Sequence, residues 1–230
     1  MDITNKRLIR NFLSRKSNNK ALQWSLFTLF VCLVMSNVYW NFSPGIGDLL
    51  AASPEKVFAS KEYWRLFTSS FIHADLAHLL SNSLMMTIMG YFVIYQYGVL
   101  IFPFLGFIAG IFINLIVIWN YSAGSTIVGA SGIVHYLWGY WLVLYILIQH
   151  HVPFNRRLMK VTAVGIFILA PTEFKPNVSY LAHAIGLAFG IFTGICYFIF
   201  NRQMIRSYEH WEPVVERVDE ELAQEALNSK

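Results

Sequence analysis

Long apolar runs separated by short polar segments make up most of the chain. A helix needs about 20 apolar residues, at 1.5 Å rise each, to cross about 30 Å of hydrocarbon. The runs are continuous and do not alternate, and lipid offers no partner to a bare peptide group, so they predict spanning helices. Six spans are expected, the fifth of them short: Ala21–Trp40, Ala77–Tyr97, Val99–Trp119, Ser131–Ile148, Leu158–Ala170 and Val178–Phe200. The pattern predicts an all-α, six-transmembrane-helix bundle.

Composition narrows the class of protein in the same direction. Hydrophobic residues make up 56% of the chain and charged residues only 13%, about half of the roughly 25% usual for soluble domains. Between Leu76 and Asn155 there is no Asp, Glu, Lys or Arg. A soluble fold could not cover its surface with such a stretch. These facts exclude a disordered chain, a disulfide scaffold and a nucleic-acid module, and they make the lipid bilayer the expected surrounding of a polytopic membrane protein.

Basic residues predict the orientation and the outer limits of the membrane domain. Eleven Lys or Arg flank the spans on one side of a six-span arrangement. The opposite side carries only four: Lys56, Lys61, Arg65 and Lys175. Positively charged loops stay in the cytoplasm, so both termini are expected there. We therefore expect a basic cytoplasmic segment at 1–20, a transmembrane domain at 21–200 and a cytoplasmic tail at 201–230.

The loop Asn41–Ser70 on the outer side is unusually long for a compact bundle, and long loops are often functional. It carries Tyr63 and Trp64, whose side chains suit the membrane–water interface. The loop is therefore expected to lie on the membrane or partly in it.

Polar side chains inside spans are energetically expensive, which makes each of them a functional candidate. Three clusters occur, each near the start of a span that runs inward from the outer side. They are His73, His78 and Asn82 at the second span, Gly129-Ala130-Ser131-Gly132 at the fourth, and His183 with Gly186, Gly190 and Gly194 at the sixth. Glycines four residues apart let two helices approach closely. If this stripe faces the fourth span, His183 can reach Ser131.

These residue types suit nucleophilic catalysis. A serine hydroxyl becomes a nucleophile when a neutral histidine within about 3 Å removes its proton. No carboxylate lies in any expected span, so a Ser131–His183 dyad is a simpler interpretation than a triad. An oxyanion could accept hydrogen bonds from Asn82, from His78 and from the backbone at the start of the fourth helix.

Together these motifs resemble those of the rhomboid intramembrane serine proteases. The matching residues are Tyr63-Trp64-Arg65, His73, His78, Asn82, Gly129-Ala130-Ser131-Gly132, and Ala182-His183 with Gly186 and Gly190. The resemblance covers about residues 20–200. It implies substrates that are single-span membrane proteins, cut in or near the span where helix-destabilising residues loosen it, and it implies no cofactor.

The resemblance also implies roles for single residues. Ser131 is the nucleophile, His183 the general base, and Asn82 and His78 the oxyanion-stabilising pair. His73 is a supporting histidine, and Gly186 allows the fourth and sixth helices to pack closely. Trp64 and Arg65 belong to a structural motif of the first loop.

Two positions depart from the family pattern. His135 stands where the family often has a tyrosine that stacks on the catalytic histidine, and it could stack in the same way. A histidine soon after the serine motif also occurs in rhombosortases, which process C-terminal sorting anchors, so that substrate class stays open. Ile94 replaces a glutamate of the second helix that many members carry, and this change bears on stability more than on chemistry.

Two other functions remain as alternatives. The histidines at 73, 78, 135 and 183 could bind zinc or another divalent ion, although there is no HExxH motif and no carboxylate to join them. The chain could also be a non-catalytic relative that binds membrane clients. We expect a protease without a metal, in the plasma membrane of a prokaryote.

Overall fold

The computed structural model describes residues 6–15, 18–173 and 179–213, and the chain divides into two compact units. Residues 16–201 form the larger unit, and residues 1–15 with 202–230 form the smaller one. Some features expected from the sequence lie outside the described residues: Lys16, Lys175, the first residue of the sixth span (Val178), and residues 214–230 of the tail.

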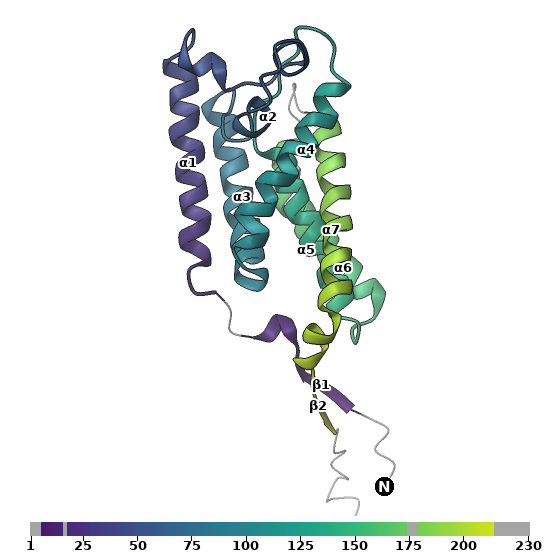
Figure 1. Cartoon of the computed structure of the whole chain (residues 1–230). Helices are drawn as coiled ribbons and strands as arrows, with labels where there is room; N and C mark the ends of the chain where they lie inside the picture. The colour runs from purple at the N-terminus through teal and green to yellow at the C-terminus, as the bar shows by residue number, and fades with distance from the viewer. Residues whose placement is uncertain (1–5, 16–17, 174–178, 214–230) are drawn as a thin grey trace, which may run out of the picture. The chain divides into compact units, whose positions relative to one another are not determined.

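The larger unit is a bundle of helices (Figure 1). Its main helices are α1 (Ala21–Asn41), α3 (Leu76–Tyr97), α4 (Gly106–Trp119), α5 (Ser131–Ile148), α6 (Phe154–Glu173) and α7 (Tyr180–Ser207), the last of which ends in the smaller unit. Within the described residues, five helical segments have the length and composition to cross a membrane: Ala21–Asn41, Leu76–Tyr97, Leu100–Trp119, Ser131–Ile148 and Tyr180–Ser207. This confirms a polytopic helical membrane protein.

The expected fifth span, Leu158–Ala170, lies within α6. This helix has 20 residues, about 30 Å at 1.5 Å per residue. Its first two turns carry Arg156, Arg157 and Lys160, and α6 is not among the segments that qualify as spans by composition. The presence of a sixth membrane-spanning helix therefore remains a prediction.

The third expected span is not one continuous helix. A short π-helix, η4 (Leu100–Leu105), precedes α4, and within η4 Phe102 has extended backbone angles (φ −142°, ψ 133°). Pro103 explains the interruption. It has no N–H to donate, and it disfavours helical geometry in the residue before it.

Glycines bring α7 against α5, as the sequence predicted. A Cβ added to Gly186 would lie 2.2 Å from the carbonyl oxygen of Gly132, and one on Gly190 would lie 2.0 Å from that of Tyr136. Only a residue without a side chain permits these helix backbones to approach so closely. Helix α5 also contacts α3, α4 and α6, while α1 packs on α3.

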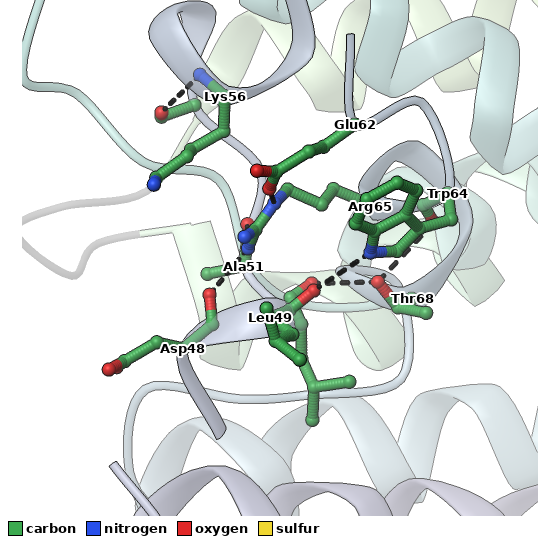
Figure 2. Close-up of polar contacts among 10 residues, drawn as sticks. Asp48, Leu49, Ala51, Lys56, Glu62, Trp64, Arg65 and Thr68 are labelled. Carbon is green, nitrogen blue, oxygen red and sulfur yellow. Dashed lines mark hydrogen bonds and ion pairs between the residues drawn. The ribbon is translucent and has the colours of Figure 1, made fainter. Parts of the chain in front are cut away.

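The loop Asn41–Ser70, called the outer loop after its expected side, is folded around the buried side chain of Arg65. The loop contains η2 (Ile46–Leu49), the π-helix η3 (Glu55–Ala59) and the short helix α2 (Arg65–Thr68). The Arg65 guanidinium, 2% exposed, binds the Glu62 carboxylate and donates to the carbonyl oxygens of Asp48 and Ala51 (Figure 2). A buried charge is tolerated only when it is paired in this way.

The smaller unit contains the only strands among the described residues. Strand β1 (Lys6–Arg10) pairs antiparallel with β2 (His210–Pro213), and the 3-10 turn η1 (Phe12–Ser14) follows β1. The fully buried ring of Phe12 meets Tyr208 edge to face at 5.6 Å, and the Arg15 guanidinium lies 3.7 Å from the Phe12 ring centre. The segments that flank α1 and α7 are therefore joined to each other.

Candidate active site

All three polar clusters of the sequence meet at one cavity of about 460 Å³. The cavity is lined by the start of α3, the segment that leads into α5, and the start of α7. Ser131, His183, Asn82, His78, Gly129 and Gly132 all line it. Three clusters that are far apart in the sequence therefore contribute residues to one cavity.

Ser131 is the first residue of α5, and the backbone before it has a demanding geometry. Gly129 has φ +115°, and a Cβ there would lie 2.8 Å from Cε1 of His78. A glycine meets both requirements, because it adopts positive φ without strain and leaves room for the ring. The Gly129 N–H donates to the carbonyl oxygen of Ser69 (2.9 Å). Ser131 thus follows a fixed turn at a helix N-terminus, where the first backbone N–H groups have no partner within the helix.

Helix α7 supplies His183, whose side chain is mostly buried (6% exposed). Its ring stacks on the ring of His135, with centroids 3.9 Å apart and planes inclined by 14°. His135 in turn places its Nδ1 2.8 Å from the carbonyl oxygen of Ser131. Because a carbonyl only accepts, Nδ1 of His135 must carry the proton. His135 therefore connects the two residues predicted to form the dyad.

Asn82 of α3 is buried (1% exposed) beside the serine turn. Its Nδ2 lies 3.5 Å from where a Cβ of Gly129 would stand, and within the described residues it has no hydrogen-bond partner. A buried amide donor without a partner is costly. Its position at the cavity suits a donor held ready for a bound oxygen atom.

His78 and His73 lie next to each other at the start of α3. The Asp75 side chain caps this helix by accepting from the backbone N–H of His78 (2.7 Å). The rings of His73 and His78 meet edge to face, with centroids 5.0 Å apart. The orientation of His78 in the cavity is thus supported by a cap and by a neighbouring ring.

His73 itself is fully buried and is held by α1. Its Nδ1 lies 3.2 Å from Ser36 Oγ, and its carbonyl oxygen accepts from Trp40 Nε1 at 2.7 Å. Burial, with a smaller contribution from the neighbouring His78, lowers the pKa of His73 to about 3. His73 is consequently neutral at physiological pH.

Other predicted site residues lie outside the cavity lining. Trp64 and Arg65 are in the outer loop, His135 is behind His183, and Gly186 is where α7 crosses α5. In the described ranges, no three His, Cys, Asp or Glu side chains are grouped so that they could hold a metal ion.

Sequence reasoning missed two contributors to the site. Asn114 is not among the residues predicted for the site, yet it lines the cavity, while its Nδ2 donates to Leu66 O (2.9 Å) and to Ser70 Oγ (3.0 Å). Asp75 was not singled out, although an Asp immediately before a helical pattern is a typical N-cap signal.

A comparison with known protein families matches most of the helical bundle. A family model described as Rhomboid domain matches residues 60–200, a range that includes every residue lining the cavity. No curated protein matches the chain.

Proposed function

Since this chain belongs to the rhomboid family, we propose that it is a serine protease that cleaves membrane-anchored proteins in or near their spanning segment. Ser131 is the nucleophile and His183 the general base. The observation that carries the proposal is that His135 bonds to the backbone of Ser131 and stacks on His183, two residues that line the same cavity.

The proposed reaction has two halves. The imidazole of His183 takes the proton of Ser131 Oγ as this oxygen attacks the scissile carbonyl carbon. The resulting oxyanion accepts hydrogen bonds from Asn82 Nδ2, from the His78 ring and from the backbone at the start of α5. Protonated His183 then gives its proton to the leaving amine, and water activated by the same imidazole hydrolyses the acyl-enzyme.

The orientation in the membrane is part of the proposal. The pairing of β1 with β2 joins the segments before α1 and after α7, which supports an arrangement with both termini on one side of the membrane. Basic residues in those segments favour the cytoplasm. The cavity, at the other ends of α3, α5 and α7, then opens on the outer side, where water is available. We place the protein in the plasma membrane of a prokaryote.

His135 also supports a second candidate substrate class, proteins with a C-terminal sorting anchor, because rhombosortases share a histidine after the serine motif. Such an enzyme would cut near a C-terminal sorting anchor. The two substrate classes differ in where the single span lies in the substrate, and one experiment can therefore compare them.

The test uses full-length protein in liposomes with two single-span reporters, one with an internal span and one with a C-terminal anchor. Each reporter is made with and without a helix-destabilising Gly-Pro pair in its span. We expect cleavage of a reporter that carries the pair, complete loss with Ser131→Ala, and no effect of a chelator. Binding without cleavage would favour the client-binding alternative, and loss with the chelator would favour the metal site.

A further inference from the structure

One wall of the cavity is a backbone segment between α4 and α5. Tyr121 and the run Thr126–Gly129 belong to this segment, and all five residues line the cavity. We call residues 121–129 the wall segment. Because it leads directly into Ser131, its position affects both the shape of the cavity and the approach of a substrate to the nucleophile.

The C-terminal half of the wall segment is bound by backbone groups of the outer loop. Ile127 forms a bridge with Ala52, in which the Ile127 N–H donates at 2.9 Å and the Ala52 N–H donates at 3.4 Å. Gly129 donates to Ser69 at 2.9 Å. Arg65 donates to the carbonyl oxygens of Asp48 and Ala51, just before Ala52 (Figure 2). This half of the wall segment is therefore bonded to a part of the loop that Arg65 also binds.

The N-terminal half is bound by a side chain. Oε1 of Glu55 accepts from the N–H of Gly124 at 2.7 Å. Gly124 is at the tip of the turn Ser122–Ser125, with φ +81°, and nothing lies within 4 Å of where its Cβ would be. Three residues further along η3, Phe58 meets Trp119 edge to face at 5.6 Å. Thus η3 contacts the chain on both sides of Tyr121.

The bond from Gly124 favours the charged form of Glu55. Backbone N–H groups, first that of Glu55 itself and then that of Gly124, hold the pKa of this carboxyl below its ordinary value. A hydrogen bond to a carboxylate is shorter and stronger than one between neutral groups. Glu55 does not line the cavity, and its bond to Gly124 connects it to the wall segment.

We propose that Glu55 is a positioning residue that holds the wall segment in place for substrate binding by the proposed protease. The inference rests on the proposed function, but the contact itself can be tested without it. Glu55 affects how well the cavity fits an extended substrate, and it does not affect the activation of Ser131.

The first arm of the test measures hydrogen exchange in full-length protein by mass spectrometry. Glu55→Ala should speed exchange of the amides in residues 121–125, the half that Glu55 binds, about tenfold, the effect of losing one charge-assisted hydrogen bond. Glu55→Gln should restore slow exchange, because its amide oxygen can still accept from Gly124. Lys56→Ala, an exposed neighbour in η3, should change nothing. Unchanged exchange in Glu55→Ala would overturn the proposal.

The second arm measures cleavage of the internal-span reporter. Glu55→Ala should raise KM about tenfold with kcat within about twofold, and Glu55→Gln should restore KM. Labelling of Ser131 by a small fluorophosphonate should keep its rate in both variants. A loss confined to kcat, or an equal loss of labelling, would contradict a role in binding. If the wild-type enzyme neither labels nor cleaves, the proposed function fails, while the exchange data still report on the contact.

Discussion

The imidazole rings of His135 and His183 stack face to face, with centroids 3.9 Å apart. The Nδ1–H of His135 donates to the carbonyl oxygen of Ser131 at 2.8 Å. One side chain therefore bonds to the first residue of α5 and packs on the proposed base in α7. This relationship fixes the plane of the His183 ring relative to the start of α5.

Replacing His135 should affect the rate of the chemical step more than substrate binding. His135→Ala removes the stacked face and leaves the His183 ring free to rotate, so we expect kcat to fall about tenfold with little change in KM. His135→Tyr should retain most of the activity, because an aromatic face remains. Steady-state cleavage of the reporter checks this, with Tyr136→Phe as the control. Wild-type kcat in His135→Ala would contradict the positioning role.

Asn82 should matter in the transition state. Its Nδ2 has no partner in the described part of the chain and is buried at the cavity, so it is available to a developing oxyanion. Loss of one such donor costs about 10²–10³-fold in kcat. We expect Asn82→Ala to show a loss of this size with an unchanged melting temperature. Ser83→Ala, the next residue of the same helix, should cleave normally. A rise in KM with an unchanged kcat would argue against the oxyanion role.

Gly186 should be intolerant of even one methyl group. A Cβ there would stand 2.2 Å from the Gly132 carbonyl oxygen, and this backbone atom can move only if α5 and α7 separate. Overpacking of this kind costs about 1–3 kcal/mol, and the separation would draw His183 away from Ser131. Gly186→Ala should lower both the melting temperature and the activity, while Ala184→Ser on the exposed side of α7 should lower neither. A Gly186→Ala enzyme with normal stability would contradict the close helix crossing.

Acid should destabilise the protein partly through His73. Burial lowers the pKa of this group to about 3 from an ordinary value of 6.5. Between these values the unfolded chain binds a proton that the folded chain does not, so the stability present above pH 6.5 is lost progressively towards pH 3. His73→Asn keeps a donor near Ser36 but does not titrate.

Thermal unfolding of the full-length protein across this pH range tests the assignment. The melting temperature of His73→Asn should fall less steeply with acid than that of the wild type. The exposed His210→Asn change in β2 should leave the slope as it is. Identical slopes in all three proteins would show that His73 is not the group responsible.

Much of the membrane domain could be predicted from the sequence, because lipid imposes a simple requirement on length and polarity. The span Ser131–Ile148 was predicted with the boundaries of α5. The meeting of His78, Ser131 and His183 at one cavity was expected from their positions near the starts of inward-running spans and from the glycine stripe of the sixth span. The packing of Gly186 and Gly190 on α5 followed from their spacing, and the structure confirms it.

The polar contacts around the site could not be predicted in this way. The bonds from Gly129 to Ser69 and from Gly124 to Glu55 join residues far apart in the sequence, and no periodicity reports such pairs. The pairing of β1 with β2 could not be predicted for the same reason, because its two strands lie near opposite ends of the sequence. The break in the helix at Phe102 could have been predicted, because Pro103 disfavours helical geometry in the residue before it. The continuous apolar run instead favoured a single unbroken helix.

The central claim is that His183 activates Ser131. The most direct measurement is labelling of purified full-length protein in detergent with a fluorophosphonate, followed by mass spectrometry to find the modified residue. We predict an adduct on Ser131 that is absent in Ser131→Ala, is strongly reduced in His183→Ala, and is unaffected by a chelator. A folded wild-type protein that stays unlabelled while a control serine hydrolase reacts would contradict the account.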